Sequence, residues 1–476
     1  MRRRVGGGVS LWRGVAFVFG VLCLLWCVAL LTPDEPVEVG CVNVHFPSAG
    51  SVVEAAAGGA LSVDDRLAEV STSLDVGGDS ASSALADSVA ALGRALAIGE
   101  ASLRFPGGDL AYLFPVFEAM RSAADAEVGV IHFGDSQIEG DRITHVVRDS
   151  LQALFGGAGP GVVPLWQPIP TRTVEQTLSD SVATFYAAGI MGQRAPHDRY
   201  GATAQLSELR GGEVQLTVAA RQARARRFRR VTAYVGTSAD TLRVTVGGLC
   251  QAVPPSVSLR ALRWDVAACR KVSMTLAGAG DVYGVGVGGA GGVSVTNVPL
   301  RGSDGLFFSR MNQSLFSRMA REMNTRLIIM EFGGNALPML DDSAGVFRYA
   351  AAVGGQIERV KSLCPDARII FVGPADMSVK VNGTLQTHPL LPALAQALAS
   401  TCDEHGVAFW DMFAVMGGWN SMMAWVSHSP PLAGPDYIHF TMRGANKIAG
   451  VLWRAIRASY DYMIMRQRLD AEEAGA

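Results

Sequence analysis

Segments far apart in the chain carry side chains that together could cleave an ester. One segment is Gly134-Asp135-Ser136, and another, near the C-terminus, contains Asp436 and His439. A serine becomes a nucleophile when a base lies within hydrogen-bond reach and a third group orients that base. With Asp436 three residues before His439, one turn can place the carboxylate against one imidazole nitrogen and leave the other for the serine. We therefore predict Ser136, Asp436 and His439 as catalytic residues.

The same residues have simpler explanations. Asp135 and Ser136 are types that often cap a helix. A histidine three residues after an aspartate is a common surface pair, so His439 could be an ordinary histidine at the start of the last helix.

Attack on an ester carbonyl also needs preorganised donors for the developing oxyanion. We expect three: the backbone N–H of Ser136, a backbone N–H near Gly302, and the side-chain amide of Asn335. Asn335 follows two glycines directly after a buried strand, which lets the backbone turn sharply and direct the amide inward. An asparagine at such a position could instead form an Asx-turn.

The elements that hold these residues alternate between strand and helix. Val128 to Phe133 is an apolar run typical of a buried strand, and an amphipathic helix is predicted from Ile138 to about Phe155, with its N-terminus near Ser136. The same rhythm returns from Phe307. Predicted helices (309–324, 346–363, 390–405 and 441–466) alternate there with predicted strands (326–332, 367–373 and 407–411). Such alternation predicts a parallel sheet covered by helices on both faces.

Between these parts, from about Pro164 to Val298, short alternating strands are separated by Gly, Pro and Ser turns, which predicts an inserted β-sandwich. A Gly-x-Gly-x-x-Gly pattern at 286–291 is followed by a strand rather than a helix, so we exclude a dinucleotide site. Six arginines lie between Arg221 and Arg230. They could bind an anionic polymer, although a solvated strand and loop is the commoner explanation.

The N-terminus predicts a membrane anchor. Three arginines at 2–4 precede the uncharged apolar run from Gly14 to Leu31, and no small-residue cleavage site follows. We expect a single-pass anchor in the cytoplasmic membrane with the catalytic domain in the periplasm or outside the cell. A cleaved signal peptide is the alternative. Residues up to about 105 are rich in Ala, Gly and Ser and predict a tether of low order.

The formal net charge of −2 provides no field that would recruit nucleic acid. The seven cysteines lack metal-ligand spacing. In an exported protein, Cys250 could pair with Cys269 and Cys364 with Cys402, leaving Cys41 unpaired. Neither a metal nor a cofactor is implied.

Together the motifs resemble those of the SGNH (GDSL-type) hydrolase family. The corresponding blocks are Gly134-Asp135-Ser136 with Gln137 in place of leucine, Arg301-Gly302-Ser303, Gly333-Gly334-Asn335 and Asp436-x-x-His439. By this resemblance Ser136, Gly302, Asn335 and His439 are the four name-giving residues, and Asp436 supports His439. Gly305 is an alternative to Gly302. The Gly-x-Ser-x-Gly signature of α/β-hydrolases is absent around Ser136.

Three features more specifically resemble the bacterial peptidoglycan O-acetylesterase branch: Phe-Gly-Asp-Ser-Gln, a β insert before the second block, and Asp-Tyr-Ile-His-Phe-Thr. In that branch the insert is a carbohydrate-binding-like module. The resemblance implies an α/β flavodoxin-like, three-layer fold and a serine esterase that deacetylates an envelope glycan. An O-acetyltransferase with the same triad and a glycan-binding scaffold with a vestigial triad are the alternatives. The expected domains are the anchor (1–32), the tether (33–105), the hydrolase domain in two parts (106–169 and 299–465), the inserted β-sandwich (170–298) and a tail (466–476).

Overall fold

The computed structural model describes residues 37–39, 42–44, 62–72, 82–190, 192–221 and 227–475. The chain divides into two compact units, residues 1–65 and 66–476. In the first, β1 (Val37–Val39) and β2 (Val42–Val44) pair antiparallel. The predicted anchor, residues 1–32, and Cys41 lie outside the described residues. None of the helices in the described ranges is both long and apolar enough to cross a bilayer.

The second unit is built on a five-stranded sheet in which every pair is parallel. Its order is β13-β3-β14-β15-β18. The strands are β3 (Glu127–Gly134), β13 (Gly292–Pro299), β14 (Thr325–Glu331), β15 (Arg368–Val372) and β18 (Ala408–Trp410). Numbered along the chain this order is 2-1-3-4-5, the flavodoxin-like arrangement. The parallel α/β sheet expected from the alternating elements is confirmed.

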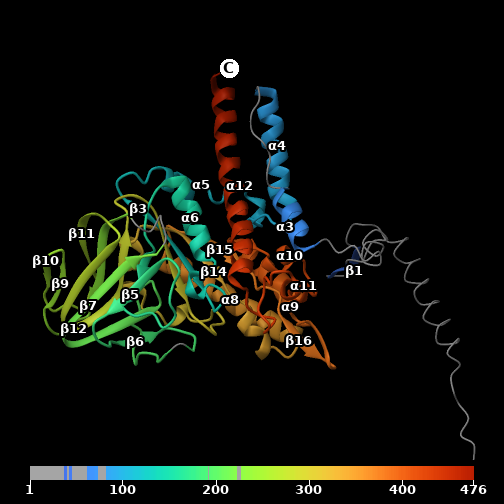
Figure 1. Ribbon diagram of the computed structural model, residues 1–476. Coiled ribbons are helices and arrows are strands. Elements are labelled where there is room, and N and C mark those ends of the chain that lie inside the picture. The colour runs from blue at the N-terminus through green and yellow to red at the C-terminus, as the bar shows by residue number, and fades with distance from the viewer. Residues whose placement is uncertain are drawn as a thin grey trace, which may run out of the picture. The chain divides into compact units, whose positions relative to one another are not determined.

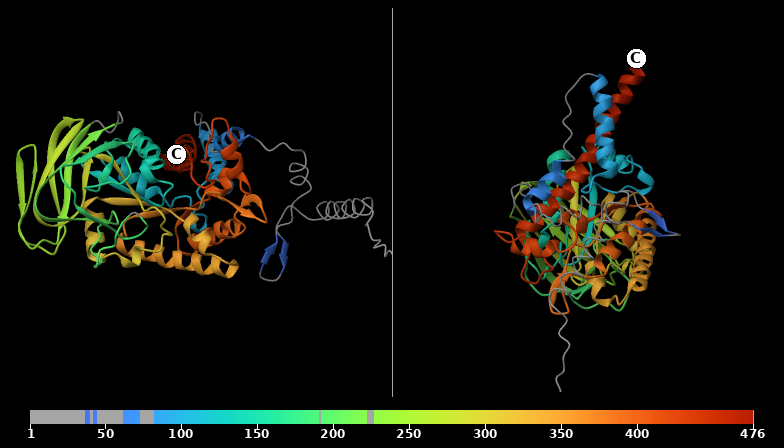
Figure 2. Two further views of the ribbon diagram at one scale, coloured as in Figure 1. Left: turned by 60° about the horizontal axis from the view of Figure 1, so that its bottom comes forward. Right: turned by 90° about the vertical axis from the view of Figure 1, so that its right-hand side faces the viewer.

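Helices cover both faces of this sheet, so the unit has three layers (Figures 1 and 2). On one face lie α5 (Phe114–Arg121), α6 (Thr144–Phe155) and α12 (Met442–Gly475). On the other lie α7 (Gln313–Glu322), α8 (Ser343–Leu363) and α9 (Leu391–Glu404). Between β18 and α12 come two short helices, α10 (Met412–Met416) and α11 (Ser421–Ser427). A hairpin of β16 (Ser378–Val381) and β17 (Thr384–Thr387) precedes α9.

The β insert, residues 161–288, forms one nine-stranded antiparallel sheet. Its strands are β4 (Gly161–Val163), β5 (Val174–Leu178), β6 (Ala183–Tyr186), β7 (Gln205–Ala220), β8 (Phe228–Gly236), β9 (Leu242–Val246), β10 (Leu249–Val253), β11 (Arg260–Cys269) and β12 (Lys271–Gly288). The first half of β12 pairs with β7 and β9, and its second half with β8 and β4, with a change of register near Gly278. The insert has an apolar core of its own, with Phe228 and Trp264 among its buried members. A sandwich of two separate sheets remains a prediction.

The structure corrects several predicted boundaries. Gly292-Val-Ser-Val-Thr296, predicted as the last strand of the insert, belongs to β13, which pairs parallel with β3 in the central sheet. The predicted tether ends early, because α4 (Ser82–Ile98) packs against α12. Beyond α4, Leu103 is fully buried and Trp410 donates to the Ala101 carbonyl at 2.9 Å. The alternating apolar pattern of β13 did not distinguish an antiparallel strand from a parallel edge strand.

The proposed disulfides are wrong. Cys250, Cys269, Cys364 and Cys402 are all free thiols. Cys364 and Cys402 are buried, and Cys250 is exposed on β10. Cysteine spacing in the sequence does not determine whether two thiols meet at disulfide geometry.

Candidate active site

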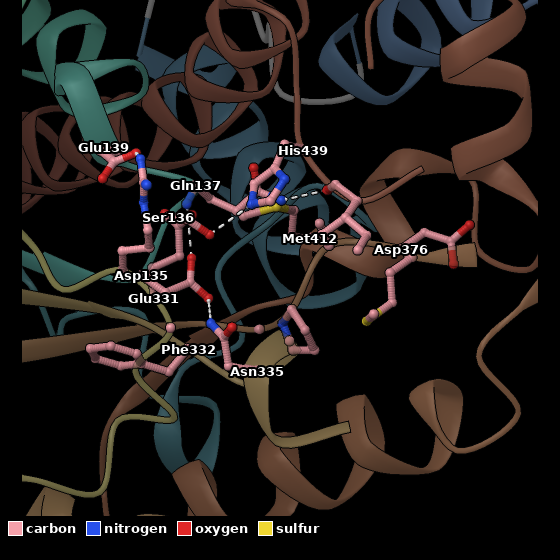
Figure 3. Close-up of a pocket in the computed structure, with 18 of the residues that line it drawn as sticks. Asp135, Ser136, Gln137, Glu139, Glu331, Phe332, Asn335, Asp376, Met412 and His439 are labelled. Carbon is pink, nitrogen blue, oxygen red and sulfur yellow. Dashed lines mark hydrogen bonds and ion pairs between the residues drawn. The ribbon is translucent and has the colours of Figure 1, made fainter. Parts of the chain in front are cut away.

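The predicted site residues meet at the carboxyl ends of β3 and β14. Gly134 at the end of β3 is in register with Glu331 at the end of β14, so the two following loops start side by side. This is the switch point of a 2-1-3-4-5 sheet, where the connections diverge and leave a crevice. A cavity of about 520 Å³ lies there, and Ser136, Gly302, Asn335 and His439 all line it. Figure 3 labels Ser136, Asn335 and His439 in this cavity.

Ser136, His439 and Asp436 form a continuous hydrogen-bonded chain. The Ser136 Oγ lies 2.8 Å from His439 Nε2, and His439 Nδ1 lies 2.7 Å from Asp436 Oδ2 (Figure 3 shows the serine and the histidine). Because a carboxylate only accepts, it holds the imidazole proton on Nδ1 and leaves Nε2 free to accept the serine proton. This geometry matches what a serine nucleophile requires.

The loop that carries the pair is held in one conformation. Besides the imidazole, Asp436 accepts hydrogen bonds from the backbone N–H groups of Ile438 and His439, both at 3.1 Å. Tyr437 between them has a φ of 58°, a left-handed conformation that is costly for a tyrosine. Burial alone would raise the pKa of Asp436, but the hydrogen bonds from His439 and the backbone outweigh it and hold that pKa below its ordinary value.

Two side chains join the serine turn to the histidine loop. The Gln137 amide donates to the Ile438 carbonyl at 2.7 Å and accepts from the Phe440 N–H at 3.4 Å. Arg142 donates to the carbonyls of Ser136 and Phe440, the latter at 3.1 Å. These contacts join the segments that carry Ser136 and His439. Sequence analysis noted Gln137 only as a departure from leucine and missed Arg142, which has no distinctive neighbours in the sequence.

Asn335 lies in the cavity but is already engaged. Its Nδ2 donates to Asp135 Oδ2 at 2.7 Å and to the Ser303 carbonyl at 3.2 Å. Asp135 Oδ1 in turn accepts from the Gln137 N–H at 2.9 Å. Burial, reinforced by the nearby Glu331 carboxylate, raises the pKa of Asp135 to about 7 despite these hydrogen bonds. Asp135 therefore ties the serine turn to the asparagine loop instead of capping a helix.

The alternative glycines of the second block are distinguished by position. Gly302 lines the cavity, whereas Gly305 does not, and the Gly305 N–H already donates to Ser303 Oγ at 3.2 Å. Within the described residues, the N–H groups of Ser136 and Gly302 donate to no protein acceptor. Both are therefore free to bind a ligand oxygen.

The helix predicted next to Ser136 begins later than expected. Glu139–Asp141 is a 3-10 turn and α6 starts only at Thr144, so the helix N-terminus does not face the serine. Asp141 has a φ of 66°, and its buried carboxylate accepts two hydrogen bonds from Arg148 at 2.5 and 3.1 Å. Asp141 is thus held by a buried ion pair in the turn before the helix, which the apolar spacing of the sequence could not reveal.

A buried carboxylate that sequence analysis missed lies behind the serine. Glu331 lines the cavity and its Oε2 lies 3.2 Å from His132 Nε2, while His132 Nδ1 lies 2.9 Å from Thr144 Oγ1. The signal in the sequence was a charged residue directly after the apolar run from Leu327 to Met330. Across the described part of the chain, no cluster of His, Cys, Asp and Glu has the geometry to hold a metal ion.

Comparisons with known proteins identify the fold and the family of this chain. A peptidoglycan O-acetylesterase of known structure matches 75% of this chain and 96% of its own at 19% identity and a TM-score of 0.58, which shows a common fold. A family two carbohydrate esterase from Cellvibrio japonicus matches 61% of this chain and 99% of its own. Another, from Clostridium thermocellum in complex with cellohexaose, matches 59% of this chain and 100% of its own. Their identities are 9% and 10%, and their TM-scores of 0.25 are too low to carry an argument. No curated protein sequence matches. The model of the GDSL-like lipase/acylhydrolase family matches residues 133–447, so this chain belongs to that family and is a carboxylic ester hydrolase.

Proposed function

We propose that this protein is a serine O-acetylesterase that removes acetyl groups from an envelope glycan, with peptidoglycan as the favoured polymer. The observation that carries the proposal is the hydrogen-bonded chain from Ser136 through His439 to Asp436 at the mouth of the cavity. Intact contacts of this kind favour a working esterase over a binding scaffold with a vestigial triad.

In the proposed reaction, Ser136 Oγ attacks the acetyl carbonyl while His439 Nε2 accepts its proton. His439 then donates that proton to the sugar oxygen, which leaves as a hydroxyl, and acetate remains esterified to Ser136. Water activated by His439 hydrolyses the acyl-enzyme and releases acetate. The Asp436 carboxylate stabilises the imidazolium that forms in both steps.

The oxyanion is proposed to bind the free N–H groups of Ser136 and Gly302. Asn335 can contribute only by exchanging one of its present hydrogen bonds, and the longer one, to the Ser303 carbonyl, is the weaker. Its shorter bond to Asp135 would then keep the amide directed at the cavity. Each such donor stabilises the transition state by about 3 kcal/mol.

The substrate and cellular location complete the proposal. An envelope glycan is supported by the fold shared with a peptidoglycan O-acetylesterase and by the β insert, which we propose acts as a carbohydrate-binding-like module beside the cavity. The basic N-terminus and apolar run 14–31 support a single-pass anchor in the cytoplasmic membrane that holds the catalytic domain in the periplasm or outside the cell.

Acetate release tests the proposal. The protein and its Ser136→Ala variant are incubated with acetylated peptidoglycan, acetylated xylan and p-nitrophenyl acetate, and the variants are compared by circular dichroism. We expect acetate from peptidoglycan with the native protein and none with the folded variant. Turnover that survives Ser136→Ala would contradict the mechanism. Acetyl transfer to an added glycan in excess of acetate release would favour the transferase instead.

A further inference from the structure

The β insert has more basic than acidic residues. Residues 161–288 contain fifteen Arg or Lys and eight Asp or Glu residues, whereas the whole chain has a formal net charge of −2. The insert therefore carries a formal net charge of +7, fifteen minus eight, within a chain whose formal net charge is −2. Charge concentrated in this way creates a local field that attracts anions even when the net charge is near zero.

Strand register gathers the basic side chains at one end of the insert. β5 begins at Val174, β7 ends at Ala220 and β12 begins at Lys271, and these strands are neighbours in the sheet (Figure 1). The Arg221 N–H donates to the Thr173 carbonyl, and the Ala220 N–H to the Arg270 carbonyl, both at 2.9 Å. β8 starts beside them, because Phe228 pairs with Cys269. We call the six exposed residues at this place the basic end: Arg172, Arg221, Arg227, Arg229, Arg270 and Lys271.

Most of the basic end lacks counter-charges. Arg221 lies 3.7 Å from Glu175. Elsewhere on the insert, Arg230 pairs with Asp265 at 2.9 Å and Arg263 with Glu322 at 2.7 Å. Among the residues that the structure describes, no carboxylate forms an ion pair with the other five members of the basic end. Their charges face solvent and are available to an external anion.

The basic end is fixed to the turn that follows the nucleophile. The Arg172 N–H donates to the Gly140 carbonyl at 3.3 Å, and Thr173 donates its hydroxyl to the buried Asp141. Glu139, the residue before Gly140, lines the cavity that contains Ser136. A polymer bound along the basic end therefore passes close to one side of the cavity.

We propose that the basic end binds the carboxylates of an anionic glycan, and that this glycan is the polymer whose acetyl esters reach Ser136. The inference rests on the proposed function and deepens it by assigning the charge class of the substrate. A carboxylate-bearing glycan such as peptidoglycan presents negative charges at repeated intervals, which complements exposed cations spread over four strand ends. A neutral acetylated glycan such as xylan lacks these charges.

A matched pair of triple variants tests whether the basic end binds an anionic glycan. Arg227→Gln/Arg270→Gln/Lys271→Gln removes three charges from the basic end. Arg210→Gln/Arg243→Gln/Arg260→Gln removes three exposed charges from β7, β9 and β11 at positions away from the basic end, where Arg210 lies 3.6 Å from Glu208. There Arg210 pairs with Ala279 and Arg243 with Ala277, so the control positions lie roughly 20 Å or more along β12 from Lys271. Both variants are made with and without Ser136→Ala.

Binding is measured in the Ser136→Ala background by co-sedimentation with acetylated peptidoglycan, either untreated or with its carboxylates amidated by carbodiimide coupling. We expect the basic-end variant to bind untreated peptidoglycan about tenfold more weakly, since each exposed ion pair contributes modestly, and the control variant to bind normally. Amidation of the peptidoglycan or added salt should weaken binding by the native protein to the level of the basic-end variant.

Activity on two substrates separates this inference from the proposed function. With Ser136 intact, we expect the basic-end variant to hydrolyse p-nitrophenyl acetate normally but to release acetate from peptidoglycan with a raised KM. Equal binding by both triple variants, binding that is insensitive to amidation, or preferential binding to anionic lipid vesicles would overturn the inference. If charge-dependent binding holds but the native protein releases no acetate, the proposed function fails and the docking surface stands.

Discussion

The side-chain amide of Gln137 donates a hydrogen bond of 2.7 Å to the backbone carbonyl of Ile438, the residue before His439. Two segments about three hundred residues apart are thereby joined within one residue of both Ser136 and His439. In an ester hydrolase whose serine and histidine come from different loops, such a contact sets their separation. We therefore expect Gln137 to act as a positioning residue for Ser136 and His439.

Replacing Gln137 tests that role. Gln137→Leu removes both hydrogen bonds to the histidine loop while keeping a similar volume, so we expect kcat for p-nitrophenyl acetate to fall about tenfold with little change in KM. Gln137→Glu loses the donor to Ile438 but keeps an acceptor for the Phe440 N–H, and it separates the two contacts. An unchanged kcat in both variants would show that the loop holds its position without Gln137.

Asp436→Asn should keep the loop but lose the charge. An amide cannot stabilise the imidazolium, and we expect kcat to fall by about three to four orders of magnitude. Because the pKa of Asp436 is lowered on folding, its stabilising interaction is complete above its ordinary pKa and is lost as pH falls through the lowered value. Unfolding by urea at several acidic pH values should therefore show a smaller pH dependence in the variant than in the native protein.

Asn335 is expected to affect both rate and stability. Asn335→Ala removes a proposed oxyanion donor and should lower kcat by about 10²–10³-fold. The same change leaves the buried Asp135 carboxylate without one of its two hydrogen bonds, so the Tm should also fall. Asn335→Asp places a second carboxylate against Asp135 and should lower both kcat and Tm further than Asn335→Ala does. A variant with lower Tm but native kcat would assign Asn335 a structural role alone.

Glu127 offers a stability test remote from the chemistry, at the start of β3. Burial raises the pKa of Glu127 to about 7, although the Gly289 N–H at 2.8 Å opposes the shift. A raised carboxyl pKa favours the neutral form on folding, so the stability contribution is complete at acidic pH and is lost as pH rises through about 7. Glu127→Gln should therefore match the native protein near about pH 4 and exceed its unfolding free energy near about pH 8, with kcat unchanged. Equal stability of the two proteins at both pH values would contradict the raised pKa.

The free thiols predict a simple pattern of reactivity. Cys250 is exposed, whereas burial raises the pKa of Cys364 to about 12 and that of Cys402 even further. We expect Cys250→Ser to remove a fast thiol reaction of the native protein, and Cys364 and Cys402 to react only after unfolding. A reductant should leave the Tm unchanged. A reductant-sensitive Tm would indicate a disulfide.

The sequence by itself determined the parallel α/β fold and the candidate residues Ser136, Asp436, His439, Asn335 and Gly302. This was possible because buried strands, helices and the residue types of a serine hydrolase depend on local pattern and on chemistry. Only the tertiary structure decided that β13 belongs to the central sheet, that Gly302 rather than Gly305 lines the cavity, and that the four described cysteines do not pair. It also revealed Gln137, Arg142 and Glu331, whose roles consist of contacts with segments distant in the chain. Local periodicity records which face of an element is apolar, whereas the partner that covers that face is fixed only when the whole chain packs.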